Sequence, residues 1–168
     1  MKGLPRSLAR AQLSSIMNTS IRVKDLTVSV ADGAPGFGTA VLAGLPQGNI
    51  LYLGAVSYLQ FTTADADISA TFDGDYAIGT VPTANNSLAD AGDADIVPST
   101  AFGAATAKVS PVIRGASTDA LGGLIIDNTA GTLELNLNVL IDDAAISGAA
   151  DFTVQGSVHI AYVLLGDD

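Results

Sequence analysis

Residues 132–141 read TLELNLNVLI, and this stretch decides the fold class. Its apolar and polar residues alternate, which is the side-chain period of a β-strand with one buried face. The apolar set predicted to face inward is Leu133, Leu135, Leu137, Val139 and Ile141, and the polar set predicted to face outward is Thr132, Glu134, Asn136 and Asn138. A strand of this length spans about 33 Å, the full height of a sandwich.

The same period of two recurs along most of the chain. It covers residues 26–30 and 152–164, and residues 68–72 continue into 76–78 across Asp73-Gly74, which predicts a hairpin. Residues 79–107 are rich in small and polar residues and predict a long loop with little core. We therefore expect residues 25–168 to form an all-β domain, an antiparallel β-sandwich with a jelly-roll-like arrangement.

Residues 50–61 are apolar on both faces of the predicted strand. Tyr52, Val56 and Tyr58 share one face, and Leu51 and Leu59 lie on the other. A strand that is apolar on both sides is buried on both sides, by its own domain or by a neighbouring subunit. We expect Tyr52, Val56 and Tyr58 to lie in a subunit interface of a homo-oligomer.

Charge is distributed unevenly along the 168 residues. The chain has 7 basic and 17 acidic residues; five of the basic ones lie in residues 1–24, and no acid precedes Asp25. Residues 1–24 therefore form a basic N-terminal arm of charge +5, extended or partly helical, while residues 25–168 carry −15. An acidic body repels nucleic acid and anionic membranes, so neither is an expected partner. The arm is expected to contact an acidic protein surface through Arg6, Arg10, Leu13, Ile16, Arg22 and Lys24.

Few residues are available for catalysis. The chain has no Cys and no Trp, His159 is its one imidazole, and no G-x-S-x-G motif accompanies that histidine. The close Asp pairs in turn-like segments do not match an EF-hand loop, and solvated turn residues explain them better than calcium ligands. We expect a non-enzymatic protein with no catalytic residue, no metal site and no cofactor.

Five segments of the body resemble small virion structural proteins of tailed bacteriophages: residues 26–42, 45–56, 96–101, 125–138 and 161–168. The resemblance is one of overall pattern across residues 25–168, and no single motif is diagnostic. It implies a capsid decoration (cement) protein. Such proteins typically form trimers of β-sandwich subunits on the outer surface of the capsid, bound to the major capsid protein. The arm lies outside the strongest similarity.

Three other functions remain open from the sequence. The first is a tail, neck or head-fibre component of a virion, and the second is a calcium- or carbohydrate-binding β-sandwich, either an enzyme or a lectin. The third is a jelly-roll major capsid subunit whose arm binds the packaged nucleic acid. Five positive charges are few for that last task, because affinity for nucleic acid grows with the number of phosphates neutralised.

Overall fold

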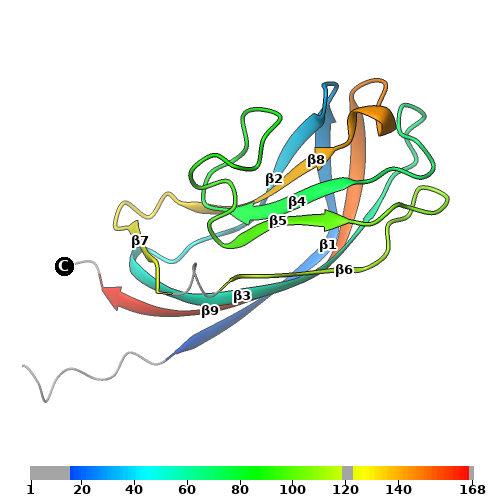
Figure 1. Cartoon of the computed structure of the whole chain (residues 1–168). Coiled ribbons are helices and arrows are strands. Elements are labelled where there is room, and N and C mark those ends of the chain that lie inside the picture. The colour runs from blue at the N-terminus through cyan, green and yellow to red at the C-terminus, as the bar shows by residue number, and fades with distance from the viewer. Residues whose placement is uncertain (1–15, 119–122, 167–168) are drawn as a thin grey trace, which may run out of the picture.

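The computed structural model describes residues 16–118 and 123–166, and its regular structure is almost entirely β (Figure 1). The all-β antiparallel fold expected from the sequence is confirmed, because every strand pair in the described ranges is antiparallel. The elements are β1 (Met17–Ala31), β2 (Gly36–Gly44), β3 (Gly48–Thr62), β4 (Gly74–Gly79), β5 (Val97–Phe102), β6 (Ile113–Ala116), β7 (Ile125–Asn128), β8 (Glu134–Ile141), the 3₁₀ helix η1 (Asp143–Ala145) and β9 (Ala150–Gly166).

The strands form one continuous sheet that folds over on itself. Its order is β5-β4-β8-β2-β1-β9-β3-β6, with β7 paired to β3. The fold line lies between β1 and β2, which pair only at Val30–Gly38 and Ala31–Phe37. Two facing layers result: a β8 layer (β5, β4, β8, β2) and a β9 layer (β1, β9, β3, β6) (Figure 1). The end strands β5 and β6 also lie close together, so the sheet is nearly closed, as in a jelly-roll-like domain.

An aromatic cluster fills the space between the layers. Phe61 stacks on Phe102 with ring centroids 4.9 Å apart, and Phe72 meets Phe152 edge-on at 5.0 Å. Tyr76 completes the cluster 5.6 Å from Phe61. These five rings come from both layers and from the loop before β4, and all are at most 1% exposed. Buried aromatic pairs of this geometry contribute about 0.5–1.5 kcal/mol each beyond their burial, so the cluster joins the two layers.

Strand β8 confirms the inward half of the prediction for residues 132–141. Leu135, Leu137, Val139 and Ile141 are almost fully buried. Asn136 and Asn138 of the outward half are nevertheless buried, at 3% and 0% exposed. The loop between β4 and β5 covers the outer face of β8 at this point, because the Asn138 amide donates to the carbonyl oxygens of Val81 (2.9 Å) and Asp93 (2.8 Å).

Strand β3 owes its two apolar faces to a β-bulge. Ile50 and Tyr52 point into the core, and after a register shift at Gly54 the inward positions become Leu59 and Phe61. Gly54 has a φ of +154°, which an L side chain rarely adopts. The inward-facing positions are therefore even-numbered before Gly54 and odd-numbered after it, which makes the sequence look apolar on both faces. Tyr52 belongs to the core.

Two other local predictions are wrong. Residues 68–72 form turns rather than a hairpin strand, and Asp73-Gly74 leads into β4, which pairs with β5 and β8. The predicted long loop 79–107 contains β5, whose Val97 and Phe102 are buried. Residues 68–72 alternate but bury Ile68 and Phe72 from turns, whereas β5 buries Val97 and Phe102 without the regular alternation that would identify a strand.

The sheet begins within the predicted arm. Residues 17–23 of β1 pair with β9 in unbroken register, from Met17–Tyr162 to Val23–Gly156. The alternation of Ile21 and Val23 with polar Ser20 and Arg22 explains why this stretch is a strand. Residues 1–15 of the predicted arm lie outside the described residues.

Candidate functional site

The outer face of the β9 layer gathers residues from four strands in two parallel rows. The register aligns Arg22 of β1, Ser157 of β9, Tyr58 of β3 and Arg114 of β6 in one row. The adjacent row contains Ser20, His159, Val56 and Ala116. Neighbouring strands lie about 4.8 Å apart, so the two arginine Cα atoms are about 14 Å apart, at opposite ends of one row. We call this surface, the two rows together with Lys24, the groove face.

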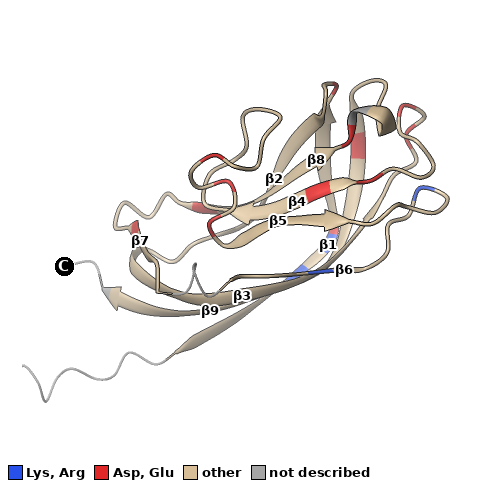
Figure 2. Cartoon of the chain, in the orientation of Figure 1, with Lys and Arg blue, Asp and Glu red and all other residues tan. Residues whose placement is uncertain are grey.

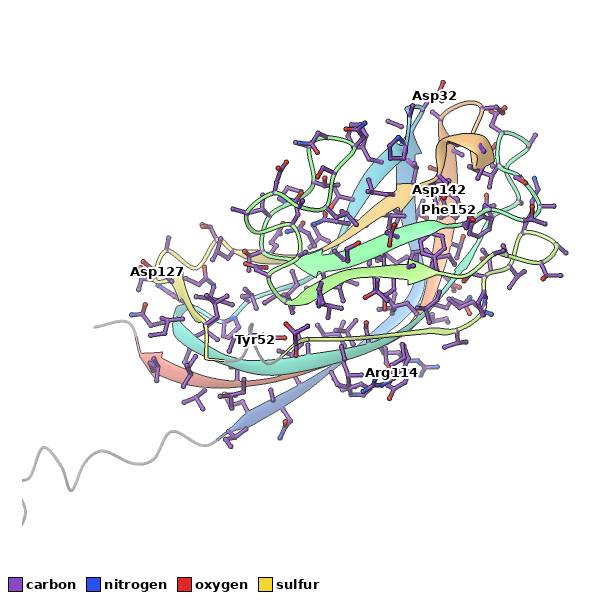
Figure 3. All side chains as sticks on the ribbon, in the orientation of Figure 1. Asp32, Tyr52, Arg114, Asp127, Asp142 and Phe152 are labelled. Carbon is purple, nitrogen blue, oxygen red and sulfur yellow. The ribbon has the colours of Figure 1, made fainter. Side chains whose placement is uncertain are left out.

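An open groove of about 540 Å³ lies along the second row, and Arg114 is the one residue of the first row that lines it. Its lining includes Asn18, Ser20, Val56, Arg114, Ala116, Ser117, His159 and Ala161. Arg114, His159 and Tyr58 are exposed, and the Tyr58 ring retains 41% of its accessible surface. Figure 3 shows Arg114 pointing away from the β8 layer, into solvent.

Positive charge is concentrated on this face. Arg22, Lys24 and Arg114 are three of the four basic residues in the described ranges, and Lys108 lies away from them in the β5–β6 loop. The two acids of this layer already accept hydrogen bonds from neighbours: Gln155 Nε2 donates to Asp25 (2.6 Å), and Ser29 Oγ donates to Asp151 (2.6 Å).

Negative charge gathers on the β8 layer and on the loops at the ends of the sandwich (Figure 2). Asp73 and Asp75 lie at the start of β4, and Asp142 follows β8; we call these three residues the acidic end. Partial desolvation, together with the nearby charges of Asp73 and Asp75, raises the pKa of Asp142. The molecule therefore has a basic surface on one layer and an acidic surface on the other.

His159, the one imidazole of the chain, lies on the groove face. His159 Nε2 lies 3.1 Å from Ser157 Oγ, and this hydrogen bond joins the exposed His159 to the half-buried Ser157 on the same strand. Within residues 16–118 and 123–166 no three His, Cys, Asp or Glu side chains are placed to hold a metal ion. The described part of the chain also has no helix that is long and apolar enough to cross a bilayer.

The residues predicted for two separate contacts share one surface. Arg22 and Lys24, predicted for a partner protein, lie beside Val56 and Tyr58, predicted for a subunit interface. Of the other arm residues, Ile16 is 63% exposed just before β1, whereas Arg6, Arg10 and Leu13 lie outside the described residues.

Tyr52 is a correction to the predicted interface. It is 1% exposed, and its hydroxyl donates to the Ile96 carbonyl oxygen at 2.6 Å. Burial raises the pKa of Tyr52 to about 12. Because it is enclosed within its own chain, it has no surface to offer a second subunit.

Sequence reasoning did not identify Arg114 or His159 as parts of this surface. Arg114 lies on the four-residue strand β6, and only the pairing of β6 with β3 places it in line with Tyr58 and Arg22. The signal available in the sequence was their position in alternating segments. Alternation predicts on which face of its strand a residue lies, but it does not predict which strand pairs alongside.

No protein-family model matches the chain, and no curated protein matches it significantly. Solved structures that are similar to this chain include the following two. One is a structure of the infectious bursal disease virus Gx strain, with 13% identity and a TM-score of 0.45. The alignment covers 92% of this chain and 34% of the viral one, so this chain spans about a third of that length. The other is the cyanophage Pam1 capsid asymmetric unit, with 19% identity, a TM-score of 0.37 and coverage of 93% and 95%.

Proposed function

We propose that the chain is a non-enzymatic structural protein of a bacteriophage virion, a decoration (cement) protein on the outer surface of the capsid. It binds the major capsid protein as a homo-oligomer, with three subunits as in the family that it resembles. The observation that carries this proposal is the groove face, a broad surface with basic and apolar residues on a rigid two-layer sandwich.

The two contacts that a decoration protein needs have separate candidates. Arg6, Arg10, Leu13 and Ile16 precede β1 and supply the contact with the capsid. Val56 and Tyr58 of the groove face supply the contact between copies. Exposed ion pairs contribute only about 0–1 kcal/mol each, so Leu13 and Ile16 must bury apolar surface on the capsid as well.

Purified virus particles test the location. Quantitative mass spectrometry of the particles, with the major capsid protein as the internal standard, should give hundreds of copies per particle. Protease treatment of intact particles should remove the chain, because it lies on the outer surface. A few copies that separate with tails would instead identify a tail or neck component and overturn the proposal.

Truncation tests the capsid contact. A variant without residues 2–16 retains all of β1, so it should keep its far-ultraviolet circular dichroism and its native mass. Its occupancy on particles that lack the wild-type protein should fall at least about tenfold, equivalent to about 1.4 kcal/mol. The control is Lys108→Gln, which removes a basic charge from the β5–β6 loop and leaves residues 2–16 intact. Unchanged occupancy of the truncated protein would exclude the arm from the contact.

A further inference from the structure

The groove face is a sheet surface without a partner in the single chain. The inner face of the β9 layer packs on the aromatic core, but its outer face presents Arg22, Tyr58, Arg114 and His159 to solvent. The face is concave along the groove, and it carries three basic side chains, Arg22, Lys24 and Arg114, against the one carboxylate of Asp25, to which Gln155 donates. A surface of this kind suits a projecting, acidic segment of protein.

We propose that the groove face binds the acidic end of a second copy of this chain, so that copies associate head to tail. Asp73, Asp75 and Asp142 of one copy would lie against Arg22 and Arg114 of the next. This inference rests on the oligomer in the proposed function and names the surfaces that form it.

Charge complementarity is the first argument for this occupant. The acidic end brings three carboxylates together at the start of β4 and the end of β8, where the backbone N–H of Asp142 donates to the Asp73 carbonyl oxygen (3.2 Å). Desolvation and then the like charges of Asp73 and Asp75 raise the pKa of Asp142, so the three carboxylates destabilise one another. Arginines from a neighbour would offset that repulsion.

Position is the second argument. The acidic end adjoins the loop that precedes β4 and the 3₁₀ helix that follows β8, and Figure 1 shows both connections at one end of the sandwich. The groove, in contrast, is lined by the middle of β3 and β9. The two surfaces belong to different parts of one molecule, so both are available for head-to-tail contacts at the same time.

A two-fold contact between two groove faces is disfavoured. It would place the arginine row of one copy over the same row of its partner, and like charges across an interface cost several kcal/mol. Residues 1–15 of the chain are equally unsuitable, because they contain Lys2, Arg6 and Arg10 and no acid. A heterologous contact, face to acidic end, avoids both repulsions, and it closes into a ring when the rotation between copies permits.

Charge exchange tests the inference on the purified full-length protein. One variant reverses the face (Arg22→Glu with Arg114→Glu), and a second reverses the acidic end (Asp75→Lys with Asp142→Lys). Each should weaken self-association at least about 100-fold, equivalent to about 2.7 kcal/mol, and give the mass of one chain in sedimentation velocity at low salt. The variant with all four substitutions should recover the oligomer, because its glutamates again face lysines.

Matched control variants reverse the same kinds of charge at positions outside the two proposed surfaces. Lys108→Glu reverses a cation away from the face, and Asp90→Lys with Glu134→Lys reverses two exposed acids away from the acidic end. Both controls should retain the wild-type mass. Circular dichroism and melting curves of every variant separate loss of association from loss of folding.

Several outcomes would overturn the inference. A folded four-substitution variant that stays monomeric excludes the pairing, and so does a wild-type protein that is monomeric at all concentrations. Double variants that keep their oligomer but lose particle binding would show that the face binds the shell protein instead. Particle occupancy of the wild-type protein still decides the decoration role in each case, so the two proposals can fail separately.

Discussion

Asn138 shows how one buried amide attaches a whole loop to the sheet. Its Oδ1 accepts hydrogen bonds from Thr39 Oγ1 (2.8 Å) and the Thr83 backbone N–H (2.9 Å), and its Nδ2 donates to the carbonyl oxygens of Val81 and Asp93. These four bonds join β8 to β2 and to the loop before β5. The alternation in residues 132–141 places Asn138 outward correctly, but no local pattern reveals that a distant loop covers it.

Removal of the Asn138 amide should be costly. We expect Asn138→Ala to lower the free energy of unfolding by about 3 kcal/mol, because it leaves several buried backbone groups without partners. Urea denaturation followed by circular dichroism measures this. Asn136→Ala is the control, since Asn136 is also buried but donates only to the Glu134 carbonyl oxygen, and about 1 kcal/mol is expected. Equal losses in the two variants would contradict this account of Asn138.

Asp93 should make stability depend on pH. The residue is 2% exposed and its Oδ2 has no hydrogen-bond partner; burial, with the charges of Asp90 and Asp95, raises its pKa above 3.8. Between 3.8 and the raised pKa the folded chain holds a proton that the unfolded chain releases. The free energy of unfolding therefore falls as pH rises through that window. Urea titrations of wild-type protein and Asp93→Asn at several pH values should show a smaller fall in the variant; parallel curves would refute this role.

At the scale of whole elements, one glycine allows two long strands to pack closely. Gly156 of β9 has a φ of +143° and lies so close to β3 that a Cβ atom there would overlap the Tyr58 carbonyl oxygen. Opposite this glycine, β1 carries the register shift between Val23 and Leu26. The glycine thus lets the central strand of the β9 layer approach β3 at the position where β1 bends.

Substitution of Gly156 tests this close approach. Gly156→Ala should lower the free energy of unfolding by at least about 3 kcal/mol, because it combines a strained φ with a backbone clash. Gly44→Ala in β2 is the matched control: no atom lies within 4 Å of its added Cβ, and we expect a change below about 1 kcal/mol. Thermal and urea unfolding of both variants would measure the difference. A small effect at Gly156 would show that β3 and β9 can separate there.

An element could be predicted where its own sequence pattern determines it, and could not where distant residues determine it. The inward face of β8 follows from its own alternation, and so does the strand character of β9. The frame change in β3 and the pairing of β4 with β5 depend on residues far away in sequence. The groove face could not be predicted from the sequence, which places Arg22 in an arm and Tyr58 on one face with Tyr52. Only the strand order β1-β9-β3-β6 aligns Arg22 and Tyr58 with Arg114.

The whole molecule separates its charges between two layers. The chain has a net charge of −10, yet three of its described basic residues share the groove face while the carboxylates gather on the β8 layer and the loops. Two electrostatic effects of opposite sign follow. Repulsion among the acids destabilises each folded chain, whereas attraction between the groove face and the acidic end stabilises the proposed oligomer.

Salt should move these two effects in opposite directions. A rise from ~0.01 M to ~0.15 M NaCl shortens the Debye length from ~30 Å to ~8 Å. Screening of the acids should raise the melting temperature of the monomeric Arg22→Glu/Arg114→Glu variant. The wild-type oligomer should be weaker at the higher salt concentration, so it should dissociate at a higher protein concentration. Melting curves and sedimentation velocity across the same salt series measure both. A wild-type mass that is independent of salt would mean that burial of Val56 and Tyr58, rather than charge, holds the copies together.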